Sequence, residues 1–161
     1  MRAKSNGFSL IELLIVVAII LIIAAIAIPN FLRSRMAANQ SSAVASCRGI
    51  ASSELTYLTM YGQGYSSSLT ILGPPAGGGV PTPSAADLID SYLAAGIKSG
   101  YSFAYVPTSQ DAQGRYQGFM INANPTEPGV TGNAYYYTDQ SFVIRENGTT
   151  TASASDSPIG G

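Results

Sequence analysis

The chain has 161 residues and a net charge of −1 at pH 7, and only 11% of its side chains are charged. This length suits one domain, and the charge balance excludes the basic surface that a nucleic-acid-binding domain requires. There is no histidine and a single cysteine, so Cys-His and Ser-His-Asp catalysis, histidine-based metal sites and an intrachain disulfide are all excluded. We expect a protein that is not an enzyme and binds no nucleic acid.

The first seven residues, MRAKSNG, contain two basic side chains and no acid. Basic residues in front of an N-terminal apolar segment favour a cytoplasmic N-terminus, so Arg2 and Lys4 predict that orientation and an exported remainder. A secretory signal peptide would carry its small-residue cleavage site after a shorter apolar core, whereas Gly7 stands before the apolar run. Removal of residues 1–7 would leave the following helix intact.

Residues 8–28 (FSLIELLIVVAIILIIAAIAI) contain one ionisable side chain, Glu12. As a helix this segment spans about 31 Å, close to the thickness of a bilayer's hydrocarbon core. A carboxylate inside such a segment costs about 2.5 kcal/mol or more unless a partner compensates. Glu12 therefore predicts a nearby cation, and cleavage after Gly7 would create one as the α-amino group of Phe8, one helical turn away.

Residues 7–12 (GFSLIE) and the apolar run that follows resemble the class III leader and N-terminal helix of type IV pilins and the related pseudopilins. The resemblance covers residues 1 to about 35. It implies cleavage between Gly7 and Phe8 by a prepilin peptidase, N-methylation of Phe8, and packing of the apolar helices into a filament core. It also implies that Glu12 pairs with the N-terminal amine of a neighbouring subunit. A plain membrane anchor, in which Glu12 reaches the membrane surface, is the alternative.

The apolar run differs from many members of that family at one position and matches them at another. Leu21 stands where those members have a glycine, and Pro29 matches their proline. Proline removes a backbone donor and clashes with the carbonyl four residues earlier. We therefore expect a kink or local unwinding near residues 25–28, the alternative being that the helix ends at Pro29.

Residues 29–61 predict an amphipathic extension of the helix, because apolar side chains recur at steps of three and four and residues 30–61 contain no proline. The expected buried stripe is Val44, Cys47, Ala51, Leu55 and Leu58, with Ile50 beside it. The glycines at 62 and 64 are expected to end the helix. Within this stripe Cys47 is expected to act as a small buried apolar residue.

Residues 62–161 predict a small globular head. Residues 62–83 are rich in proline and glycine and indicate a surface loop. Ser84 and Asp87 resemble a capping box before a short helix from Ala85 to Ala95, stopped by Gly96. Its expected buried face is Leu88, Tyr92 and Leu93.

Alternating apolar residues after Gly100 predict two antiparallel strand pairs. The first joins Tyr101–Tyr105 to Tyr116–Ala123, and the second joins Asn133–Thr138 to Ser141–Arg145 through a turn at residues 139–140. Residues 147–161 are expected to be irregular. The expected fold is α+β and pilin-like, with a long N-terminal helix packed on an antiparallel sheet of about four strands.

Four segments follow from these patterns: a leader at 1–7, a transmembrane and filament-core helix at 8–28, an amphipathic extension at 29–61 and a head at 62–161. We expect no cofactor. Calcium held by the loop carboxylates of Asp111, Asp139 and Asp156 is a further hypothesis, against which these residues are interpreted as solvated turn residues. Asn39 and Asn147 each begin a glycosylation sequon.

The leading functional hypothesis is a structural subunit of a type IV pilus that polymerises through its N-terminal helix for attachment, motility or uptake. Its partners would be copies of itself, a prepilin peptidase and methyltransferase, and the assembly machinery. It would reside in the inner membrane as a precursor and then in an extracellular filament. The alternatives are the major pseudopilin of a type II secretion system, in a periplasmic pseudopilus, and a monomeric membrane-anchored binding protein.

Overall fold

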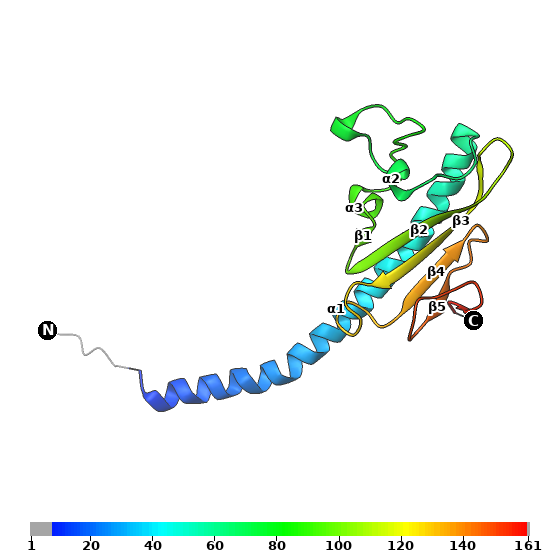
Figure 1. The fold of residues 1–161 in the computed structure, drawn as a ribbon. Coiled ribbons are helices and arrows are strands. Elements are labelled where there is room, and N and C mark those ends of the chain that lie inside the picture. The colour runs from blue at the N-terminus through cyan, green and yellow to red at the C-terminus, as the bar shows by residue number, and fades with distance from the viewer. Residues whose placement is uncertain (1–7, 161) are drawn as a thin grey trace. The chain divides into compact units, whose positions relative to one another are not determined.

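The computed structural model describes residues 8–160, and the chain divides into two compact units, Met1–Arg35 and Met36–Gly161. Each unit is described by itself. Helix α1 (Leu10–Tyr61) contributes to both of them, and the second unit carries all the strands (Figure 1).

In the first unit, α1 continues through Pro29 as an uninterrupted α-helix. The helix therefore neither unwinds near residues 25–28 nor ends at Pro29, and the expected kink stays a prediction. Proline removes one backbone hydrogen bond, whereas the neighbouring turns keep theirs. Leu10, Ile20 and Ile28, which represent the apolar run, all leave more than half of their surface exposed.

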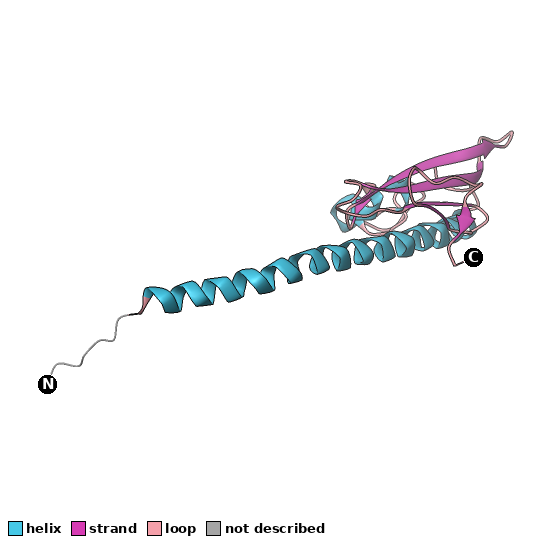
Figure 2. Ribbon diagram, turned by 90° about the horizontal axis from the view of Figure 1, so that it is seen from below, coloured by secondary structure: helices cyan, strands magenta, loops and turns pink. Residues whose placement is uncertain are grey.

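In the second unit, six antiparallel strands form one sheet in the order β1-β2-β3-β4-β5-β6. The strands are β1 (Ile97–Lys98), β2 (Tyr101–Gln110), β3 (Tyr116–Pro125), β4 (Tyr135–Asp139), β5 (Arg145–Asn147) and β6 (Ser157–Pro158). Within this unit α1 lies along one face of the sheet (Figure 2). The α+β, pilin-like class is confirmed, with two strands more than expected because the two-residue strands β1 and β6 have no periodic pattern to reveal them.

The face of α1 that packs on the sheet differs from the expected stripe. Cys47 and Ala51 are buried as expected, whereas Leu55 is 48% exposed. Ile50 is fully buried, and so is the charged residue Glu54. The buried face is therefore rotated slightly about the helix axis relative to the expected stripe. It can include Glu54 because hydrogen bonds inside the head compensate the burial of this carboxyl group.

The connection between α1 and the sheet contains short helices that the sequence did not reveal. These are α2 (Leu69–Leu72) and the 3-10 helix η1 (Ala76–Gly78). The expected helix from Ala85 is wrong. Only α3 (Ser91–Ala94) forms, and its N-cap is Asp90, whose carboxylate accepts a hydrogen bond from Leu93 N–H.

The helix is shorter than expected because backbone N–H groups in the first half of the expected range bond to another segment of the chain. The N–H groups of Ala86 and Leu88 donate to the carbonyls of Ile71 and Leu72 rather than to a helical turn of their own. The expected buried face is correct for Leu93 and wrong for Tyr92, which is 74% exposed.

The predicted strand pairs are confirmed with shifted bounds. β2 extends through Pro107, which pairs with Phe119 of β3. On its other edge β2 pairs with β1 only at Tyr101 and Ser102. That edge has no partner strand at Pro107, so the backbone N–H that proline lacks is not needed there. The second pair, β4 and β5, begins its return strand at Arg145, because residues 142–144 form a loop.

Substitution at Ile50 and Leu55 tests which face of α1 is buried. Ile50→Ala should destabilise the head by about 2–5 kcal/mol, because the fully buried side chain leaves a cavity. Leu55→Ala should change stability by less than about 1 kcal/mol, because the side chain is half exposed. Thermal unfolding of the detergent-solubilised full chain measures both, and equal losses at the two positions would contradict the packing described here.

Candidate functional site

The start of α1 shows how Glu12 is satisfied within its own chain. Ser9 N–H donates a hydrogen bond of 2.9 Å to Oε2 of Glu12. Ser9 and Glu12 have the S-x-x-E spacing of a capping box, in which the acid at the third helical position caps an unpaired donor. The negative charge also faces the positive end of the helix dipole. The sequence contained this signal, and our interpretation of Glu12 as a residue that requires a cation overlooked it.

The predicted site residues are not all gathered in one place. Phe8 is 79% exposed and directly precedes Ser9, so the structure brings Phe8 and Glu12 to the same helix end. Pro29 lies in the same helix, 17 positions after Glu12. Gly7 lies outside the described residues. An amine created on Phe8 would therefore form next to a carboxylate that is already held in position.

One helix in the described part of the chain, α1, is long and apolar enough to cross a membrane. None of its most apolar stretch is buried against other parts of the chain. An apolar surface of this size needs lipid or other protein chains to cover it. A lipid bilayer or another protein chain is therefore the kind of surrounding that this helix requires.

Inside the head, Glu54 is a buried carboxyl group that sequence reasoning missed. It accepts hydrogen bonds from the Ser66 backbone N–H at 2.9 Å and from the Ser66 hydroxyl. The Tyr105 hydroxyl donates to the Ser66 carbonyl at 2.8 Å. Burial raises the pKa of Glu54 above its ordinary value, and the hydrogen bonds from Ser66 act in the opposite direction. This network ties α1 to the start of the following loop and to β2.

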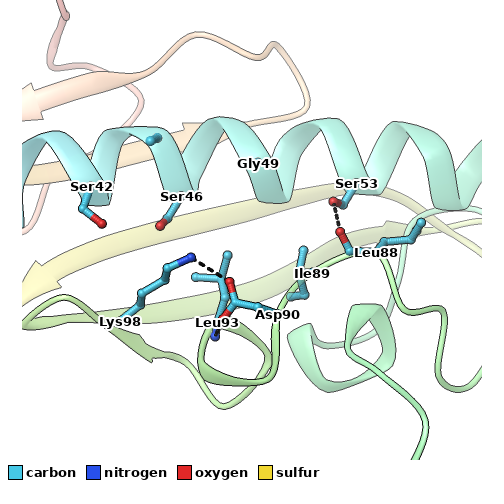
Figure 3. A pocket seen from close by; sticks show the side chains of 10 residues that line it. Ser42, Ser46, Gly49, Ser53, Leu88, Ile89, Asp90, Leu93 and Lys98 are labelled. Carbon is cyan, nitrogen blue, oxygen red and sulfur yellow. Dashed lines mark hydrogen bonds and ion pairs between the residues drawn. The ribbon is translucent and has the colours of Figure 1, made fainter. Parts of the chain in front are cut away.

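A groove of about 300 Å³ lies between α1 and residues 88–98 (Figure 3). Small residues of α1 line one side, and Ser53 donates a hydrogen bond of 3.0 Å to the Leu88 carbonyl. On the other side Lys98 pairs with Asp90 at 2.6 Å. The partly exposed pair neutralises both charges, so the groove presents a small, nearly uncharged surface.

A second hollow lies on the β4–β5 side of α1, where exposed Leu55 and Phe142 meet buried Ile144. Thr138 also lines it, and the Thr138 hydroxyl is buried with no hydrogen-bond partner among the described residues. A buried hydroxyl without a partner is unfavourable by about 1–3 kcal/mol. Because Leu55 and Phe142 are exposed, the head also has uncovered apolar surface on this side.

The C-terminal segment is held without a disulfide. Asp156 accepts hydrogen bonds from the Ser153 N–H and hydroxyl and from the Asn147 side chain. Arg145 donates to the Asp156 carbonyl at 2.8 Å, and Asn122 donates to the Ala152 carbonyl at 2.6 Å. The hydrogen bonds around Ser153 and Asn147 lower the pKa of Asp156, so its carboxylate stays charged near neutral pH. The segment expected to be irregular is thus fixed by polar contacts and by β6.

Cys47, the lone cysteine, is fully buried, as expected. Burial raises the pKa of the Cys47 thiol to about 12. The thiol therefore stays protonated, which makes it a poor nucleophile and a poor metal ligand.

The loop carboxylates are engaged with their own turns. Asp111 accepts hydrogen bonds from the backbone N–H groups of Gln113 and Arg115, and Asp139 accepts one from Ser141 N–H. Among residues 8–160, no three His, Cys, Asp or Glu side chains gather closely enough to hold a metal ion. The hydrogen bonds of Asp111 and Asp139 are those of turn residues.

Both sequon amides also have protein partners. Asn39 donates to the Thr131 carbonyl at 2.9 Å from within α1, and Asn147 donates to Asp156. A glycan at either position would require that hydrogen bond to be given up.

Comparison with known proteins gives a family match at the N-terminus and similar relatives. Residues 2–28 match the family described as "Prokaryotic N-terminal methylation motif". The chain is 43% identical over 56 residues to the type IV major pilin protein PilA of Myxococcus xanthus, across 35% of this chain and 26% of that protein.

A second relative is the type IV wide pilus major component PilA4 of Thermus thermophilus, 58% identical over 38 residues, or 24% of this chain and 29% of that protein. The chain thus spans less than a third of the length of either relative. No solved structure matches it significantly. The resemblance of the N-terminal segment to type IV pilins is confirmed.

Glu54 predicts how the stability of the head depends on pH. Its pKa is raised in the folded state, so the folded protein binds more protons than the unfolded chain as pH rises above about 4.5. Stability should therefore increase as pH falls from 7 to 5. The aspartates with lowered pKa values do not oppose this, because they lose stabilisation only below their ordinary value of 3.8.

Melting temperatures at pH 5 and pH 7 measure this effect. Glu54→Gln, which keeps an acceptor for Ser66 but cannot titrate, should lose the difference between the two pH values. A difference of the same size in the variant would show that another group causes it.

Proposed function

We propose that this chain is the structural subunit of a type IV pilus, processed at its N-terminus and polymerised through α1. The observation that carries the proposal is the methylation-motif match over residues 2–28 together with a capped carboxylate, Glu12, at the start of an uncovered apolar helix. The two relatives are named as pilus components, which supports the same role. On this proposal the protein is not an enzyme and has no resident cofactor.

The proposal gives Glu12 two successive partners. In the membrane-bound precursor its carboxylate is capped by Ser9 N–H of the same chain. Cleavage between Gly7 and Phe8 and methylation of Phe8 then produce an amine at the same helix end. In the filament, the Glu12 carboxylate pairs with the Phe8 amine of a neighbouring subunit, and subunits out of register leave a buried charge unpaired, at a cost of about 3–5 kcal/mol. Pro29 is proposed to adapt the helix to the filament core.

The alternative is the major pseudopilin of a type II secretion system, which would form a short periplasmic filament by the same chemistry. The partners are otherwise the same: other copies, the prepilin peptidase and methyltransferase, the assembly machinery and the inner membrane. The names of the two relatives favour the pilus. Electron microscopy of material sheared from the cell surface distinguishes them, because long surface filaments of this subunit would exclude the pseudopilin.

Two substitutions at Glu12 separate its cap from its charge. Glu12→Gln keeps an acceptor for Ser9 N–H and removes the charge, whereas Glu12→Ala removes both. If pairing with the Phe8 amine selects the register, both variants should leave normal amounts of subunit in the inner membrane and reduce filaments at least tenfold. Filament yield is measured by shearing and electron microscopy.

The N-terminus of each variant provides the control for processing. Mass spectrometry should find a mature chain that begins at methylated Phe8 in the unsubstituted protein, and a retained Met1 there would contradict the processing. Abundant filaments in Glu12→Gln would show that the cap alone suffices and that the ion pair is not needed.

A further inference from the structure

Two arginines stand just beyond the apolar part of α1. Arg33 and Arg35 follow the last apolar residue of the run, Ile28, by five and seven positions, and both are exposed. Between residues 8 and 35 the only acidic side chain is Glu12, 21 positions before Arg33. Within this unit the two guanidinium groups therefore have no carboxylate near them.

The spacing places these groups at a particular depth if residues 8–28 span a bilayer. With a rise of about 1.5 Å per residue, Arg33 lies about 7.5 Å and Arg35 about 10.5 Å beyond Ile28. The polar layer on each side of the hydrocarbon core is roughly 5–8 Å thick. Because arginine side chains can bend several ångströms back along the helix, both guanidinium groups reach this layer.

The two arginines also point in different directions. Residues two apart on a helix are separated by about 200° around its axis. One helix therefore presents a guanidinium group to the headgroups on each of two opposite sides. Guanidinium binds phosphate oxygens through paired hydrogen bonds, which a point charge does not provide.

We propose that Arg33 and Arg35 form a binding site for phospholipid phosphate groups at the outer face of the membrane, with a preference for anionic phospholipids. The proposal rests on the membrane-bound stage of the proposed function. It assigns a ligand to two residues that the filament chemistry of Glu12 and Phe8 does not use.

The site has a consequence for Glu12. A helix of 21 residues spans about 31 Å, the thickness of the hydrocarbon core. When Ile28 lies at the outer boundary of the hydrocarbon and Arg33 reaches the headgroups, Phe8 lies at the inner boundary and Glu12 lies about 6 Å, one helical turn, inside it. The arginines thus fix the depth of the helix so that Phe8 lies at the cytoplasmic face and Glu12 lies one helical turn from it.

Lipid retention by the unassembled full chain tests the site. The chain is purified in detergent with equal amounts of phosphatidylglycerol and phosphatidylcholine, and native mass spectrometry counts the lipids that remain bound. The unsubstituted chain should retain phosphatidylglycerol preferentially. Each of Arg33→Gln and Arg35→Gln should reduce the preference about fivefold, and the double variant by the product.

Three comparisons keep the result specific. Arg48→Gln removes an equal charge from the head and should change nothing. Arg33→Lys/Arg35→Lys keeps the charge and should retain part of the preference, which covers the case in which the glutamine variants fail to insert. Millimolar inorganic phosphate should not displace the lipid, and displacement would show a site for free phosphate and overturn the proposal.

No preference for phosphatidylglycerol, or the same preference in the double variant, would also overturn the proposal. Because the measurement uses unassembled subunits, the failure of the pilus proposal is detected separately, as the absence of filaments of the unsubstituted chain in electron micrographs.

Discussion

A carboxylate at the beginning of an apolar helix must have a partner at every stage, and the rest of the account depends on this constraint. In the isolated chain Glu12 accepts the Ser9 N–H and faces the positive end of the helix dipole. In a membrane whose outer headgroups hold Arg33, the same carboxylate lies about one helical turn from the inner boundary of the hydrocarbon. In a filament the amine of a neighbouring Phe8 is the proposed partner. The exchange gives up one local hydrogen bond, worth about 1 kcal/mol, and after it an unpaired buried carboxylate would cost about 3–5 kcal/mol, so only the correct register is favourable.

The head obeys a similar constraint with different partners. Glu54 is fully buried in the packing face of α1, and Ser66 supplies its hydrogen bonds. At the other end of the head, Asp156 holds the C-terminal segment through Ser153 and Asn147. With only one cysteine in the chain, the head relies on these polar contacts, on the sheet and on its apolar core.

Sequence reasoning succeeded where the signal was local and periodic. The 21-residue apolar run and the GFSLIE motif of residues 7–12 predicted the membrane-length helix and the relatives that the comparisons found. The alternation at Phe103, Phe119 and Ile121 predicted the central strands, because one face of the sheet is buried and the other is not.

It failed where tertiary contacts outweigh local pattern. Glu54 was not expected in the core, since its burial depends on Ser66, twelve residues later. The helix expected from Ala85 was shortened because Ala86 and Leu88 pair with residues 71 and 72. Local unwinding at Pro29 was overestimated, because the loss of one hydrogen bond does not disrupt the flanking turns. The cap on Glu12 was readable as S-x-x-E and was overlooked in favour of a cation.

A helical reconstruction of the filament at a resolution that shows side chains tests the central claim most directly. The account predicts that the Glu12 carboxylate lies within about 4 Å of the methylated amine of Phe8 in a neighbouring subunit. A filament in which Glu12 still accepts the Ser9 N–H of its own chain, with every Phe8 amine distant from it, would contradict the account.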